Sequence, residues 1–136
     1  MKHRAKEIWF KEYGYPTYRT KLFVGDYTLA TDQSVCIDTK RNILELAGNI
    51  CGKQHERFRA ECIRAQETGI QLIVLIEQIP PLNDLANWTS KLSQVKGATL
   101  KKCMETMTER YGVQFEFCKP DRTAKRIIDI LFYGEF

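Results

Sequence analysis

The chain has 136 residues, of which 43% are hydrophobic and 11% aromatic, and its formal net charge is +4. This composition predicts one folded domain with a hydrophobic core and excludes a fully disordered chain. The longest apolar run, residues 70–79, contains three polar residues and falls short of the roughly 20 residues that span a bilayer. The basic N-terminus lacks the apolar segment of a secretory signal, so we expect a cytoplasmic protein with no membrane partner.

The cysteines and histidines argue against a zinc site and against hydrolysis through histidine. The five cysteines are odd in number and form no C-x-x-C pair, so we interpret them as reduced thiols, mostly in the core. The only histidines, His3 and His55, stand 52 positions apart. With so few histidines, a Ser-His-Asp relay is not expected.

The first third of the chain predicts a helix followed by extended segments. Apolar residues at helical spacing indicate a helix over residues 3–13, which Gly14 ends. Alternation then predicts a strand over residues 17–24 and a hairpin over residues 27–37, turning at the polar residues 31–34.

The middle of the chain alternates helices with a buried strand. A helical region begins at Ile43 and is interrupted near Gly48, and a second helix ends at Gly69. The apolar, β-branched run over residues 70–76 is typical of a strand buried on both faces, and we expect it to be central in the sheet.

The last third predicts two further helices around one short strand. After the irregular residues 82–95, a helix over residues 98–110 ends at Gly112, and a strand covers residues 113–117. Asp121 is expected to cap a final helix that runs to about Tyr133. Helices interleaved with strands predict a three-layer α/β domain with a mixed central β-sheet flanked by helices.

One strand end gathers the residue types that hydrolytic chemistry needs. Asp38 and Lys40 are two positions apart, so their side chains share a face of the strand while Thr39 points to the other. Asp26 precedes Asp38 by twelve positions, and the hairpin should bring the two carboxylates together. We expect Asp38 and Lys40 to lie at a polar strand end outside the core.

Two neighbouring carboxylates repel unless a cation or a proton separates them, and a hard divalent cation satisfies both. Mg²⁺ takes one or two protein carboxylates and keeps several waters, which leaves room for a phosphate oxygen. Lys40 would then orient the attacking water or stabilise developing charge. Taken alone, the same spacing also fits a surface ion pair next to an ordinary Gly-Asp turn.

At these residues the sequence resembles the XPF-type nuclease domain, a branch of the PD-(D/E)XK superfamily of DNA endonucleases. The family pattern is Gly-Asp, a hairpin and an apolar strand that ends in Glu-Arg-Lys, and it matches Gly25-Asp26 and residues 35–40. The family's next helix and strand match residues 55–64 and 72–77, and residues 96–100 and 110–115 resemble the closing half of small forms encoded by phages and mobile elements.

The resemblance implies a restriction-endonuclease-like fold and a single nuclease-like domain over residues 1–136. It implies Asp26, Asp38 and the Thr39 carbonyl as metal ligands, with Mg²⁺ or Mn²⁺ as cofactor. Asp26 and Asp38 would serve catalysis together with Lys40, which assists the attacking water.

Three departures from the family pattern bear on activity. Asp38 and Thr39 replace the family's Glu and Arg, which keeps the carboxylate but removes a cation. The Asp that usually follows the Lys by three residues is Leu44 here, with Glu45 one place later. The family's first strand, which ends in Asp-x-Arg-Glu, is expected to be missing from this chain, and the exposed edge makes us expect a homodimer.

DNA is the expected partner, and its phosphates need basic contacts. The resemblance includes no helix-hairpin-helix module after Phe117, so the contacts should come from this domain or from a partner. The alternative for each basic residue is a solvated surface position. The candidates are Lys53, Arg57, Arg59, Arg64, Lys96, Lys101 and Lys102.

These observations predict a divalent-metal-dependent DNA endonuclease that acts on branched or structured DNA. The first alternative is a catalytically inactive pseudonuclease that binds DNA or acts as a scaffold, which the missing acidic strand favours. The second is an interaction domain with no affinity for nucleic acid. The substrate preference rests on the resemblance alone.

Overall fold

The fold is built on a sheet of three parallel strands. The computed structural model describes residues 3–52 and 54–136. In it β1 (Val35–Lys40), β2 (Gln71–Ile76) and β3 (Gln114–Phe117) lie side by side in chain order. Strand β2 is therefore central, as its apolar run predicts.

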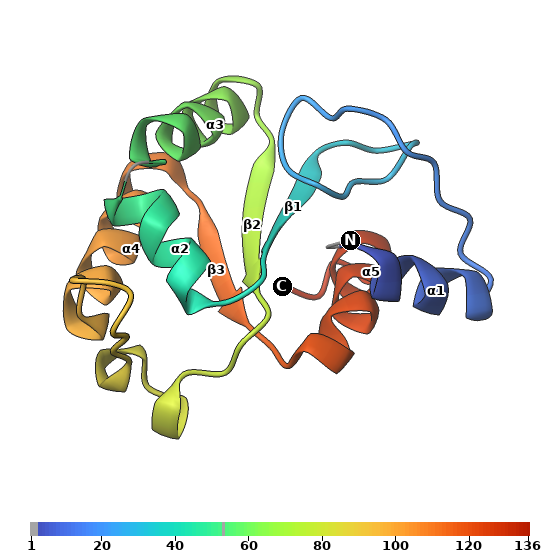
Figure 1. Cartoon of the computed structure of the whole chain (residues 1–136). Coiled ribbons are helices and arrows are strands. Elements are labelled where there is room, and N and C mark those ends of the chain that lie inside the picture. Colours follow the sequence, from blue (N-terminus) through green and yellow to red (C-terminus); the bar gives the residue numbers. More distant parts are fainter. Residues whose placement is uncertain (1–2, 53) are drawn as a thin grey trace.

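Three helices cover one face of this sheet. Helices α2 (Ile43–Cys51) and α3 (His55–Glu67) connect β1 to β2, and α4 (Gly97–Tyr111) connects β2 to β3. Strands in chain order require two crossovers in the same direction, and crossovers of the same hand place their helices on the same face. Figure 1 shows α2, α3 and α4 together on one side of the strands.

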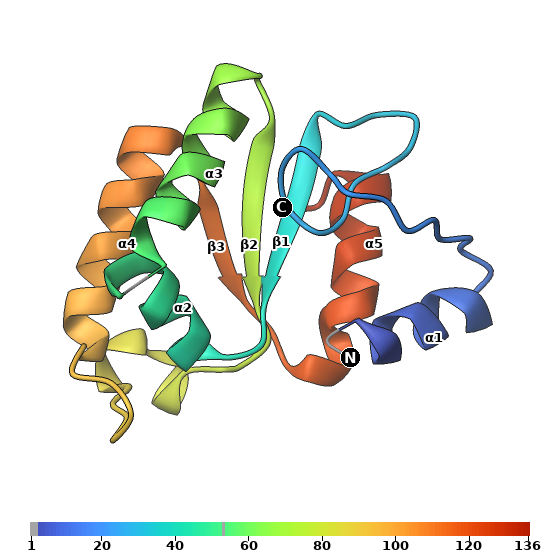
Figure 2. The same cartoon turned by 45° about the horizontal axis from the view of Figure 1, so that its top comes forward.

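The opposite face is covered by the first and last helices of the chain. Helices α1 (Arg4–Glu12) and α5 (Thr123–Tyr133) lie side by side there, far apart in sequence but neighbours in both views (Figures 1 and 2). The side chains of β2 alternate between two hydrophobic clusters. Leu72, Val74 and Ile76 pack toward α2, α3 and α4, whereas Ile73 and Leu75 pack toward α1 and α5.

The predicted three-layer α/β architecture is confirmed. Within the described residues, the antiparallel pairing that the hairpin predicts is reduced to a single bridge. Tyr27 pairs with Ile37 in antiparallel fashion, which is the remnant of the predicted hairpin. The predicted strand over residues 17–24 is wrong, because that segment forms no strand. Residues 17–21 face solvent, with Tyr18 84% exposed, and Val24 at its end is the one residue of the segment that is buried, so burial does not hold the segment on the sheet.

The capping prediction for the last helix is also wrong. Asp121 lies in a 3₁₀ turn, Pro120–Arg122, and α5 begins after it with no side-chain cap. The predicted end of α4 is correct, since Gly112 adopts a left-handed conformation with φ of 70°. No helix within residues 3–52 and 54–136 has the length and apolar content to cross a membrane.

Candidate active site

The Gly25-Asp26 turn is docked directly against β1. Gly25 has φ of +72°, and a Cβ atom there would approach the Ile37 carbonyl oxygen to 2.9 Å. The backbone N–H groups of Asp26 and Tyr27 both donate to that oxygen, at 2.8 and 3.0 Å. Glycine is required because another residue would be strained and would collide with the strand.

The Asp26 carboxylate is held by Thr39. Its Oδ2 accepts hydrogen bonds from the Thr39 backbone N–H and from the Thr39 hydroxyl, both at 2.9 Å. Thr39 is fully buried, so both donors are fixed. The hairpin remnant thus places the first predicted carboxylate beside the strand that carries the second.

Asp38 and Lys40 share the other face of β1, as the alternation predicts. The Lys40 ammonium lies 2.9 Å from Asp38 Oδ2, an ion-pair distance. The expectation that the pair lies outside the core is wrong, because Asp38 is 6% exposed and Lys40 7%. Asn49 on α2 and Phe58 on α3 both contact Lys40, so these two helices cover the pair.

Two residues that the sequence analysis missed hold Lys40 in place. Its Nζ donates to Asn49 Oδ1 on α2 at 3.1 Å and lies 5.2 Å from the centre of the Phe58 ring on α3. Asn49 in turn donates to the Glu45 carbonyl oxygen at 2.7 Å. The only available signal for Asn49 was its place as one of two polar side chains, with Glu45, in a mostly apolar helix, because the spacing from Lys40 is not diagnostic.

The Asp38 carboxyl group is electrostatically strained. Its pKa is raised to about 7, mainly by burial and in addition by the nearby charges of Glu61 and Asp26, against the attraction of Lys40. Although Lys40 is near, no described residue gives Asp38 Oδ2 a hydrogen bond of acceptable geometry. The ionised form of Asp38 is therefore disfavoured mainly by burial, and a bound cation would relieve this cost.

This donor set fits a hard divalent cation. Mg²⁺ commonly uses one or two carboxylates and completes its coordination with water. Asp38 offers an unsatisfied buried oxygen, and the effect of Asp26 on its pKa places the two carboxylates within electrostatic range. Among the described residues, no cluster of three or more His, Cys, Asp or Glu could hold a metal, so a cation here would rely on backbone oxygens and water for its other ligands.

A second buried ion pair lies across the sheet from Lys40 and was also missed. Lys6, which is 4% exposed, donates to Glu77 Oε1 and Oε2 at 3.0 and 3.1 Å. Glu77 directly follows β2, and its N–H donates to the Lys40 carbonyl oxygen at 2.8 Å. A separation of 71 residues gives no local signal for this pair.

The predicted basic residues do not form one patch. On α3, Arg57 and Arg64 are seven positions apart and share a helix face. Arg64 donates to the Phe23 carbonyl oxygen at 3.4 Å, and its guanidinium lies 5.8 Å from the Phe23 ring centre. Arg59 instead points toward α4, where it donates to the Tyr111 hydroxyl at 3.1 Å.

The remaining basic candidates lie on and before α4. Lys102 lines a pocket of about 430 Å³ between α3 and α4, together with Arg59. Lys96 and Lys101 lie at the N-terminal end of α4, where Lys101 is 3.8 Å from Asp84. Lys53 lies outside the described residues.

Comparison with known proteins identifies relatives of this fold and sequence. The model of a family described as "ERCC4 domain" matches residues 2–130. Two solved structures of XPF from Aeropyrum pernix, one of them in complex with DNA, superpose with TM-scores of 0.70 and 0.68 at 17% sequence identity. Both superpositions cover 93% of this chain but only 57% and 58% of the XPF chains. Among curated proteins, none matches the chain.

Proposed function

The chain belongs to the ERCC4 domain family, and on that premise we propose that it is a divalent-metal-dependent DNA endonuclease. Its reaction is hydrolysis of phosphodiester bonds in branched or structured DNA. The observation that carries the proposal is the ion pair of Asp38 and Lys40 on β1, with Asp26 held against the same strand. This arrangement combines two possible metal ligands with a positioned cation.

Asp26 and Asp38 would hold Mg²⁺ or Mn²⁺, with the Thr39 carbonyl as the third protein ligand. A bound ion of this kind supplies an acidified water and offsets charge on the phosphodiester. Asp38 would bind the ion as an ionised carboxylate. Metal binding favours this ionised form, whereas burial favours the protonated form.

Lys40 acts on the reacting groups themselves. With a cation on Asp38, the Lys40 ammonium would be attracted less to that carboxylate and would be able to donate to the attacking water or to a phosphate oxygen. The Asn49 amide and the Phe58 ring keep the ammonium in place during this exchange. A donor fixed before the reaction stabilises developing negative charge without a reorganisation cost.

DNA would be bound through its phosphates by the basic residues of α3 and by the N-terminal end of α4. Arg57 and Arg64 share one face of α3, and Lys96 and Lys101 lie where α4 begins. The solved XPF structure in complex with DNA supports a DNA partner for this fold. We also propose a homodimer, as expected from the sequence.

One observation favours the second candidate function, a catalytically inactive DNA-binding module. Asp38 and Lys40 are 6% and 7% exposed, and the Asp38 pKa of about 7 leaves this carboxyl partly protonated at neutral pH. A site that stays closed and protonated in the presence of DNA and metal would bind DNA without cutting it.

A cleavage assay separates the two functions. The protein is incubated with forked and linear duplex DNA in Mg²⁺, in Ca²⁺ and in excess EDTA. We expect cutting in Mg²⁺ only, and loss of cutting but not of DNA binding in Asp38→Asn. Asp32→Asn, at an exposed turn outside the site, is the matched control and should cut normally. Cutting in excess EDTA, or a wild-type rate in Asp38→Asn, would refute the proposal.

A further inference from the structure

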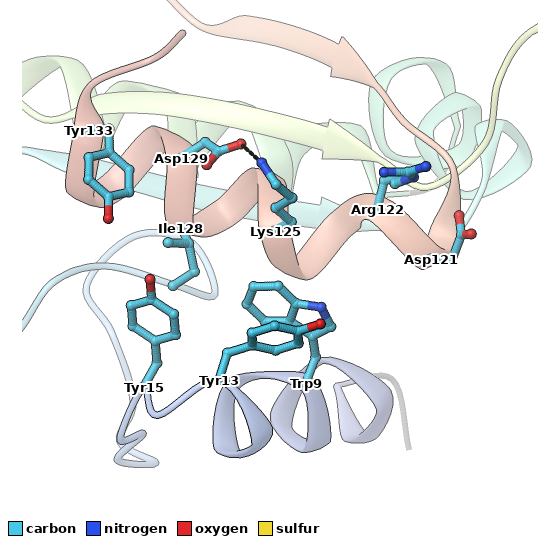
Figure 3. A pocket seen from close by; sticks show the side chains of 9 residues that line it. All are labelled: Trp9, Tyr13, Tyr15, Asp121, Arg122, Lys125, Ile128, Asp129 and Tyr133. Atoms are coloured by element: carbon cyan, nitrogen blue, oxygen red, sulfur yellow. Dashed lines mark hydrogen bonds and ion pairs between the residues drawn. The ribbon is translucent and has the colours of Figure 1, made fainter.

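An open pocket of about 460 Å³ lies between α1 and α5, on the sheet face opposite Asp38 and Lys40. Figure 3 shows that its aromatic side chains come from two distant segments: Trp9, Tyr13 and Tyr15 from the beginning of the chain, and Tyr133 from the end of α5. The hydroxyl groups of Tyr15 and Tyr133 point toward one another across it. Neither the ion pair of the candidate active site nor the basic residues for DNA contribute to this pocket.

The aromatic rings form a stacking surface at the edge of the core, against which Trp9 and Tyr15 are partly buried. Trp9 stacks on Tyr13 with ring centres 4.3 Å apart, and the Tyr15 ring is parallel to that of Trp9 within 7°. Tyr13 and Tyr133 are 63% and 65% exposed, so core packing does not account for them. Gathered, exposed aromatic residues mark surfaces that bind a partner.

The charged residues that line the pocket indicate which kind of partner it fits. Arg122 and Lys125 supply two cations, and Asp121 and Asp129 supply two anions. Lys125 and Asp129 also pair with each other at 3.0 Å. The pocket therefore has no formal excess charge, which disfavours a phosphate and favours an uncharged planar group whose edge carries hydrogen-bond donors and acceptors.

We propose that this pocket binds an unpaired nucleobase of the DNA substrate, stacked on the partly exposed ring of Trp9 and the exposed ring of Tyr13. A nucleobase has both the planar face and the polar edge that the pocket complements, and every base can stack in this way. The inference rests on the proposed function and deepens it, because it identifies a single-stranded segment as part of the substrate.

The position of the pocket connects it to the candidate active site. Asp121 and Arg122 line one end of it and lie in the turn that follows β3. Because the three strands are parallel, this turn is at the same edge of the sheet as Lys40, the last residue of β1. An unpaired strand that passes this edge can place its phosphates near Lys40 and a base in the pocket.

The test uses the tryptophan fluorescence of the intact protein, titrated with a short oligothymidylate. Stacking of a base should quench Trp9, whereas Trp88, which is 5% exposed and outside the pocket, should be unaffected. We expect quenching by the oligothymidylate, none by an abasic oligonucleotide of the same length, and loss of the quenching in Trp9→Phe. Equal quenching by the abasic strand would overturn the proposal, because it would show a phosphate site.

Affinity measurements on exposed positions test the same site without risk to the fold. Tyr13→Leu and Tyr133→Leu should each weaken binding of the single strand at least about fivefold and leave duplex binding unchanged. Tyr18→Leu replaces an even more exposed tyrosine outside the pocket and should have no effect. Unchanged affinity in both pocket variants would refute the proposal.

Two further results would overturn it in favour of another occupant. Thymidine monophosphate that binds as tightly as the oligonucleotide would show a site for a free nucleotide. A dimer that Tyr133→Leu dissociates in sedimentation, with no quenching by DNA, would show that a second copy covers the pocket. Failure of the nuclease proposal is recognised separately, because it appears as no cutting in Mg²⁺ or as normal cleavage in Asp38→Asn, and it leaves Trp9 quenching intact.

Discussion

The two sides of β1 place two carboxylates in opposite environments. Asp26 receives two hydrogen bonds from Thr39 at 2.9 Å, one from the backbone and one from the hydroxyl. Asp38, one residue before Thr39, is buried against α2 and α3 with an oxygen that lacks a suitably placed donor. Strand alternation therefore places one carboxylate among fixed donors and leaves the other with an oxygen that has none among the described residues.

The difference shows how one short strand can serve structure and chemistry together. A satisfied charge costs little to bury, whereas an incompletely satisfied one costs several kcal/mol unless it takes up a proton or a cation. The protein therefore accepts an unfavourable group at Asp38, and the hydrogen bonds of Asp26 hold the neighbouring chain in place. Variants of each side test this contrast.

The largest effect is expected for Lys40→Met, which keeps the volume of the side chain but removes the ammonium. Cleavage should fall about 10²–10³-fold, the usual loss when one fixed donor to developing charge is removed. The measurement is the single-turnover cleavage rate with saturating DNA. The exposed Lys21→Met is the control and should keep the wild-type rate. Normal cleavage in Lys40→Met would remove this residue from the mechanism.

The pH dependence of stability should report the strain at Asp38. Its folded-state pKa is raised from 3.8 to about 7, so between these values the folded protein binds a proton that the unfolded chain releases. Stability should then decrease as pH rises through this window, by up to about 1.4 kcal/mol per pH unit, and level off above it.

Urea unfolding of the metal-free protein at a series of pH values measures this dependence. Asp38→Asn removes the titrating group and should flatten the decrease. The same slope in both proteins would show that the Asp38 pKa is not raised.

On the other side of the strand, Thr39→Val should weaken the anchor of Asp26. It removes the hydroxyl donor without changing the side-chain shape, and a hydrogen bond to a charged group contributes about 1.5–3 kcal/mol. Thr28→Val is a matched control, because the Thr28 hydroxyl donates to the neutral Val35 carbonyl oxygen at 2.8 Å. Urea unfolding should show a larger loss for Thr39→Val, and equal losses would contradict a charged, anchoring Asp26.

The smallest effect is expected for Glu61→Gln. Glu61 is one of the charges that raise the Asp38 pKa, so its neutralisation should lower that pKa. In the unfolding experiment, the decrease of stability should level off at a lower pH. Glu67→Gln, at an exposed position of the same helix, should leave the profile unchanged. A shift of the same size in both variants would indicate a general charge effect.

The local pattern of the sequence predicts several of these features by itself. Alternation along residues 35–40 places Asp38 and Lys40 on one face, and the structure confirms that they meet. The apolar run of β2 predicts its central position, and the glycine at position 112 predicts the end of α4. Such patterns depend on neighbouring residues, so a single sequence carries them.

Tertiary packing alone decided the environment of those residues. The burial of Asp38 and Lys40, the contacts of Lys40 with Asn49 and Phe58, and the Lys6–Glu77 pair across 71 residues all depend on which helix covers which face of the sheet. The same holds for the aromatic pocket, whose two sides come from opposite ends of the chain. Periodicity determines which side chains share a face, whereas burial raises the pKa of Asp38 only when distant segments exclude water from that face.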